Sequence, residues 1–238
     1  MPHPIRADDR RTEPSAAASG IWAAWQRRSA VAALAERALS ESFGARAAIW
    51  LARSFTLGYG IALLLAARPA PGSVHPLLHL ALASLSLCAG LAALSAAGDG
   101  LRARLDRASG LLRSRGLVAG DALGLRAVAV ACWVPRRLTP LALLLAGIWL
   151  VFGRPPDSGM RALTMGAGLA LYLALLALAL GCLVQLAAML GGERRGRLAL
   201  LLLVGLPELL APAWPELPTV LGALGALLDR CLDPGFGG

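Results

Sequence analysis

Residues 162–189, ALTMGAGLALYLALLALALGCLVQLAAM, form the strongest apolar stretch of the chain. None of these residues is charged. A helix needs about 20 predominantly apolar residues to cross the hydrocarbon core of a bilayer, and runs of Ala and Leu favour helix. This stretch therefore predicts a membrane-spanning helix.

Apolar stretches of similar character lie on both sides of it. Residues 47–67 and 77–97 are each long enough to cross a bilayer. Residues 198–213 are also apolar, although Pro207 interrupts them. Together with a shorter stretch they predict five spans, at about 47–67, 77–97, 138–153, 162–189 and 198–213.

The composition favours a membrane protein over a water-soluble one. Hydrophobic residues make up 57% of the 238 residues, against about 45–50% in ordinary soluble domains. Residues 1–19 are polar and are expected to form a disordered tail, while 44–238 are expected to form one transmembrane domain. The predicted fold class is an all-α, polytopic membrane bundle with five or six spans and an N-terminal interfacial amphipathic helix.

The stretch 117–153 allows one crossing or two. Cytoplasmic loops carry an excess of arginine, and the loops whose side depends on this choice decide it. One crossing, at 138–153, places five of their arginines in the cytoplasm and two outside, and two crossings reverse these numbers. We therefore expect one crossing. The five are Arg136, Arg137, Arg194, Arg195 and Arg197, and the two are Arg154 and Arg161.

Arginine distribution also predicts the orientation of the chain. Segment 98–137 holds eight arginines and three aspartates, which places it in the cytoplasm. Two spans precede it, so the N-terminus is expected on the same side. Near the C-terminus, the apolar stretch 219–228 is too short to cross. A sixth span made from 214–232 would return the C-terminus to the cytoplasm.

Residues 20–43 form an amphipathic stretch that contains Trp22 and Trp25. Trp side chains favour the headgroup region of a bilayer, so this stretch predicts a helix lying in the cytoplasmic interface, with the two tryptophans as anchors. The alternative is an ordinary cytosolic helix packed on other loops.

The sequence holds no motif that would mark an enzyme. It lacks the GxxxxGK[ST] motif that binds ATP phosphates and the HExxH motif that binds zinc. Ser84 and Ser86 share a predicted helix with His79 but lack the glycine-rich setting of a serine nucleophile. The four cysteines form no CxxC pair. No catalytic, cofactor-binding or metal-binding residue is therefore predicted.

The formal charge of +9 does not indicate nucleic-acid binding. All 23 basic residues are arginines, and they lie between the apolar stretches rather than on one soluble face. Loop charge that orients a membrane protein explains this distribution. The expected contacts are therefore membrane lipid and protein partners, and not nucleic acid.

Glu208 is the most unusual single residue, because a carboxylate inside an apolar stretch is costly and often faces a partner or a water-filled path. It follows Pro207, whose missing N–H leaves a carbonyl one turn earlier without its helical partner. A broken helix with an acidic residue is typical of an ion or substrate pathway. The alternative places Glu208 in water at the outer interface.

The order of these parts resembles the membrane-spanning subunit of bacterial ABC exporters that have an interfacial elbow helix. The matching features are the Trp22/Trp25 helix, the first two spans, the arginine-rich segment 98–137, and the proline-broken stretch at 198–213. The resemblance implies a location in the bacterial inner membrane and ATP hydrolysis by a separate ATPase subunit. Residues 100–116 would be the ATPase contact, through Arg102, Arg104, Arg107, Arg113 and Arg115.

The function implied by the resemblance is that of a permease subunit working as a homodimer around a central path. That family normally has six spans with both termini in the cytoplasm, one more span than the five expected here. The alternative function is a non-enzymatic membrane scaffold or accessory protein. In that case, Glu208 and the arginines of 100–116 would tolerate replacement.

Overall fold

The computed structural model describes residues 29–66, 74–98, 101, 103–105, 124–152, 158–213, 222–223 and 226. The predicted tail, the tryptophan anchors and most of the arginine-rich loop lie outside these residues. The predictions that lie there are 1–19, Trp22, Trp25, Arg102, Arg107, Arg113 and Arg115.

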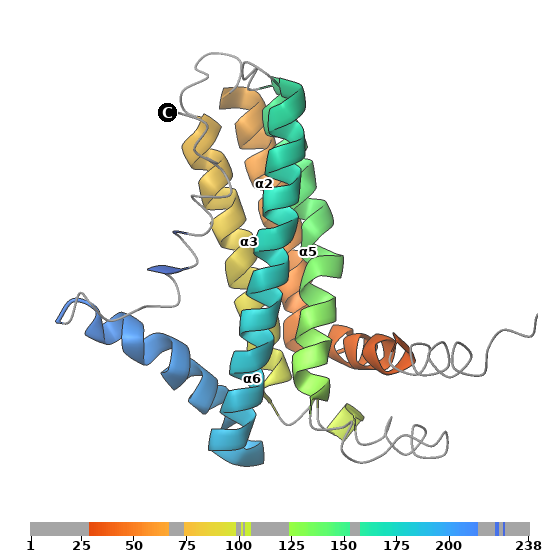
Figure 1. The fold of residues 1–238 in the computed structure, drawn as a ribbon, viewed down its shortest axis with the longest axis vertical. Coiled ribbons are helices and arrows are strands. Elements are labelled where there is room, and N and C mark those ends of the chain that lie inside the picture. Colours follow the sequence, from red (N-terminus) through yellow and green to blue (C-terminus); the bar gives the residue numbers. More distant parts are fainter. Residues whose placement is uncertain are drawn as a thin grey trace, which may run out of the picture.

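The described part of the chain is helical throughout its elements and contains no strand, which confirms the all-α prediction for these residues. A helix over 29–40 (the 29–40 helix) comes first. It is followed by α2 (Phe43–Ala66), α3 (Val74–Ala96), α5 (Leu125–Phe152) and α6 (Ser158–Leu210). Figure 1 shows α2, α3, α5 and the first arm of α6 side by side in one bundle, with the 29–40 helix running crosswise to it.

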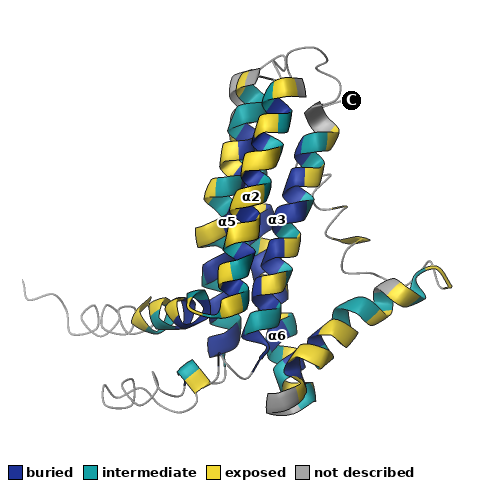
Figure 2. Ribbon diagram, turned by 180° about the vertical axis from the view of Figure 1, so that it is seen from behind, coloured by how far each residue is buried: buried dark blue, intermediate teal, exposed yellow. Residues whose placement is uncertain are grey.

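Four helices in the described residues are long and apolar enough to cross a membrane. Their candidate spans are Phe43–Leu65, Pro76–Ala96, Leu125–Val151 and Leu163–Gly191. Leucines on their outer faces are exposed, including Leu57, Leu80, Leu144 and Leu171 (Figure 2). An exposed apolar surface of this extent is typical of a protein surrounded by lipid, so the fold is that of a helical membrane protein.

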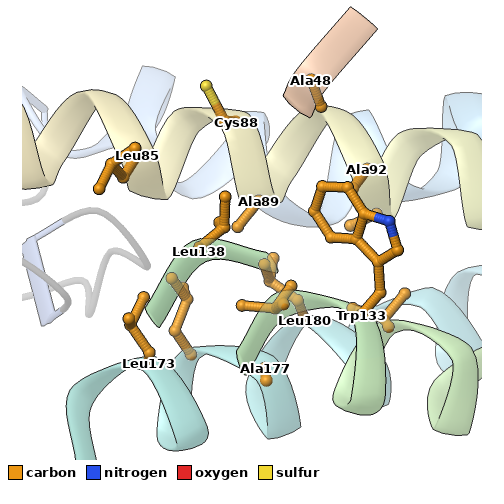
Figure 3. Close-up of a cluster of buried hydrophobic side chains, with 14 of the residues drawn as sticks. Ala48, Leu85, Cys88, Ala89, Ala92, Trp133, Leu138, Leu173, Ala177 and Leu180 are labelled. Atoms are coloured by element: carbon orange, nitrogen blue, oxygen red, sulfur yellow. The ribbon is translucent and has the colours of Figure 1, made fainter. Parts of the chain in front are cut away.

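Small residues let the helices of the bundle approach closely. Alanines of α2 and α3 bury their side chains in the core of the bundle, among them Ala48, Ala89 and Ala92. In Figure 3, Trp133 points from α5 toward Ala89 and Ala92 of α3. A Cβ added at Gly181 of α6 would lie 3.0 Å from the Ala127 carbonyl oxygen of α5. Close backbone approach of this kind is a common basis of helix association in membranes.

The helix α5 is one continuous helix of 28 residues that contains Pro135 and Pro140. The sequence predicts a span beginning at 138, whereas this helix begins at Leu125 and carries Arg136 and Arg137 in its interior. It therefore includes residues 125–137, which the sequence places in the cytoplasmic segment 98–137.

The helix α6 joins two predicted spans, 162–189 and 198–213, within one 53-residue element. Figure 1 shows its axis turning sharply at the lower end of the bundle, so that a second arm leaves the bundle. A Cβ added at Gly191 would lie 2.9 Å from the Cβ of Ala199, although residues eight apart in a straight helix are separated by about 12 Å. The bend therefore leaves no room for a side chain at position 191, where glycine stands. A span over 198–213 and a sixth over 214–232 stay predictions.

Candidate functional site

The 29–40 helix is attached to the bundle in two ways, through its buried face and through the turn at its C-terminal end. Ala35 and Leu39 bury their side chains completely, and Glu36 lies with them on the inner face. The helix ends at a turn over residues 41–42. There the Ser42 hydroxyl accepts a hydrogen bond from the Ala45 backbone N–H at 3.2 Å, which caps the first turn of α2. This cap fixes the point where the chain changes direction into the bundle.

Glu36 is the central group of the site. Its Oε2 accepts a hydrogen bond from Arg136 Nη1 at 2.7 Å, and its Oε1 lies 3.8 Å from Arg137 Nε. The Glu36 side chain is only 5% exposed, while those of Arg136 and Arg137 are 69% and 43% exposed. A buried carboxylate requires charged or hydrogen-bonded partners, and these two neighbouring arginines of α5 supply them.

A second acidic residue extends this set of charges toward the segment after α3. Glu41 lies 3.4 Å from Arg37 and 3.9 Å from Arg104. Both contacts are exposed and are therefore weak, at about 0–1 kcal/mol each. We call this set the arginine cluster, and its six members are Glu36, Arg37, Glu41, Arg104, Arg136 and Arg137. Four arginines face two carboxylates, which leaves two positive charges in excess.

The C-terminal end of α3 lies close to two further arginines. The Arg126 side chain, which is buried, donates a hydrogen bond to the Ala97 carbonyl at 3.4 Å. A Cβ added at Gly98 would collide with the Arg197 guanidinium, and one added at Gly196 would lie 2.5 Å from the Ala97 carbonyl oxygen. Cations near a helix C-terminus are stabilised by its dipole. The bend of α6 is thus packed directly on the end of α3.

Hydroxyl groups join α3 to its neighbours inside the bundle. The hydroxyls of Ser86 and Tyr172 are hydrogen-bonded at 2.8 Å. The Ser84 hydroxyl donates to the Leu80 carbonyl at 2.8 Å and lies 3.4 Å from the Tyr59 hydroxyl. Polar contacts between membrane helices of this kind contribute modestly to association. The two serines therefore have partners on α2 and α6.

The structure places the remaining predicted site residues in different parts of the chain. Pro207 is half-buried in the second arm of α6, and the backbone of Glu208 continues the same helix. The side chain of Glu208 lies outside the described set, so its two interpretations both stay predictions. Of the five arginines predicted to contact an ATPase, Arg104 is described, and it lies in the arginine cluster.

Glu36 is the member of the cluster that sequence reasoning missed. The amphipathic pattern of 20–43 predicts a helix but assigns Glu36 no role. An acidic residue that falls on the apolar face of such a helix, rather than on its polar face, was the available signal.

Among the residues that the structure describes, no three His, Cys, Asp or Glu side chains come together in a group that could hold a metal ion. Cys88, Cys132 and Cys182 are free thiols. The described side chains therefore offer charge and hydrogen-bond contacts at one end of a membrane bundle.

The fold and the arginine cluster together define a helical membrane protein with a strongly basic end. Comparisons of the chain with protein-family models, with curated proteins and with solved structures found no match.

Proposed function

We propose that the chain is the membrane-spanning permease subunit of an ABC-type exporter, with ATP hydrolysed by a separate partner subunit. In this proposal it lies in a bacterial inner membrane with its N-terminus in the cytoplasm, and two copies surround the substrate path. The proposal rests on the arrangement of helices at the basic end of the bundle.

The main observation in support of this proposal is that the 29–40 helix is attached to α5 through Glu36 and Arg136. This helix lies crosswise to the bundle (Figure 1), as an elbow helix would at a membrane surface. Glu41 of the adjoining turn also lies near Arg104, in the segment between α3 and α5. A partner bound to that segment would therefore act on the bundle through a short series of direct contacts.

The distribution of charge supports a cytoplasmic location for this end. Arg104 follows α3, Arg126 lies in the first turn of α5 and Arg197 packs on the end of α3, while Arg136 and Arg137 lie about three turns into α5. The helix α6 starts at the opposite end of the bundle (Figure 1). Concentrated arginine favours the cytoplasmic side. The second arm of α6, with Pro207 and Glu208, would contribute a fifth span to the substrate path, and residues 214–232 a sixth.

The direct test is purification of the tagged full-length chain from its native membrane. The expected result is a stable complex with an ATPase that carries a GxxxxGK[ST] motif, in equal numbers of chains. An Arg104→Glu variant should weaken this complex, because it reverses the charge at the predicted contact. Arg161→Glu is the matched control, because Arg161 lies at the start of α6, at the other end of the bundle. This variant should retain the complex with the ATPase.

The alternative function, a membrane scaffold without transport, makes the opposite prediction. The chain would purify without an ATPase, and both Arg104→Glu and Glu208→Gln would leave the phenotype of the cell unchanged. Loss of substrate export in Glu208→Gln, with the ATPase complex intact, would support the pathway role of Glu208 specifically.

A further inference from the structure

Arg136 and Arg137 have more positive charge than their protein partner can neutralise. Both guanidinium groups face the single carboxylate of Glu36, and both side chains remain substantially exposed. Arg136 uses Nη1 for its 2.7 Å hydrogen bond. Because a guanidinium carries five N–H donors, the exposed part of each group retains donors that point away from Glu36.

These two arginines lie at one end of an exposed face of α5, and the rest of that face is apolar. Residues seven apart lie on the same face of a helix after two turns, so Leu143 and Leu144 follow Arg136 and Arg137 on one face of α5. Both leucines are exposed, and Val151 continues the row. Ala129 and Val130, two turns before the arginines, are buried. The exposed face of α5 therefore begins with the arginine pair and continues with leucine and valine.

The length of this face is close to the full thickness of a hydrocarbon core, with the arginines at one boundary. From Arg136 to the end of α5 at Phe152 the helix rises about 25 Å, close to the ~30 Å thickness of a hydrocarbon core. The 29–40 helix contacts α5 at the same level. Exposed arginines are costly inside hydrocarbon, so this level corresponds to the headgroup region.

We propose that Arg136 and Arg137, at the junction of the 29–40 helix with α5, bind the phosphate of an anionic lipid headgroup. The planar guanidinium group binds phosphate through two parallel hydrogen bonds. The excess positive charge of the arginine cluster favours a headgroup with net negative charge over a zwitterionic one, whose cationic end it repels. This site requires only that the bundle lies in a bilayer, so it does not depend on the transport function.

Native mass spectrometry of the purified full-length chain tests the site, with phosphatidylglycerol and phosphatidylethanolamine as competing lipids. The Arg136→Gln/Arg137→Gln double variant should lose its preference for phosphatidylglycerol by roughly 25-fold, because each of the two arginines near an anionic surface contributes about fivefold. The matched control is Arg53→Gln/Arg195→Gln, which removes the same charge from α2 and α6. It should retain the preference.

Glu36→Gln gives a result that misfolding cannot imitate. The neutral amide no longer competes with phosphate for Arg136, so the preference for phosphatidylglycerol should rise by about fivefold. No gain in Glu36→Gln, an unchanged preference in the Arg136/Arg137 variant, or an equal loss in the control would each overturn the site. Displacement of the lipid by millimolar inorganic phosphate would assign the pair to a soluble phosphate ligand instead.

Discussion

Arg136 Nη1 lies 2.7 Å from Glu36 Oε2, and this contact joins two helices whose residues are 100 positions apart in the chain. Glu36 is buried, whereas Arg136 is exposed. The carboxylate thus depends on the arginine more than the arginine depends on it, because water can solvate only the guanidinium.

Replacement of Arg136 by Gln should destabilise the protein by about 1–3 kcal/mol, the cost of removing a hydrogen bond from a buried charged group. Arg137 limits the loss, because it remains near the carboxylate. Thermal unfolding in detergent measures the effect. Arg37→Gln is the control, since its exposed contact with Glu41 should contribute no more than about 0.5 kcal/mol. Equal effects of the two variants would contradict the importance of Glu36 burial.

Replacement of Gly196 by Ala should destabilise the bend of α6. The added Cβ would lie 2.5 Å from the Ala97 carbonyl oxygen, so the end of α3 or the bend must move, at a cost of about 1–3 kcal/mol. Gly205→Ala is the matched control in the second arm, because its Cβ would meet no atom within 4 Å. The control should be neutral or stabilising by up to about 1 kcal/mol, as alanine favours helix over glycine. Unfolding in a graded series of denaturing detergent compares the two.

The hydrogen bond between Ser86 and Tyr172 should contribute about 0.6 kcal/mol, and no more than about 2 kcal/mol, to the association of α3 with α6. A double-mutant cycle with Ser86→Ala and Tyr172→Phe isolates this coupling energy. The same cycle on Ser84 and Tyr59, whose hydroxyls are 3.4 Å apart, should give a smaller value. A larger coupling for the second pair would show that distance does not rank these contacts.

Cysteine labelling in sealed membranes should distinguish the two ends of the bundle. In a Cys132→Ser/Cys231→Ser background, a membrane-impermeant maleimide should label Ala103→Cys only from the cytoplasmic side and Ser158→Cys only from the other side. Residue 103 follows α3, and residue 158 begins α6 at the opposite end (Figure 1). Labelling of both from one side would contradict the single crossing by α5.

The apolar stretches of the sequence predicted where the bundle helices lie, because hydrocarbon requires long, uncharged helical segments. Residues 47–67 and 77–97 fall almost entirely within α2 and α3, and 162–189 fall within α6. The remaining features depend on tertiary contacts. From the sequence, Arg136 and Arg137 were expected in a loop between helices. Their position inside α5 could not be predicted, because their carboxylate partner, Glu36, comes from a distant segment. The junction of the α6 bend with α3 was likewise missed, because it depends on a glycine that meets a carbonyl of another helix.

The 100 residues between Glu36 and Arg136 also set an order of events during synthesis. At about 5–20 residues per second, a ribosome takes roughly 5–20 s to make the chain between them. Throughout that interval the 29–40 helix exists without the arginines that later cover its carboxylate, so Glu36 must stay in water or at the headgroups. Attachment of this helix is therefore a late step, completed only after α5 has entered the membrane, and it marks a bundle whose third apolar helix is in place.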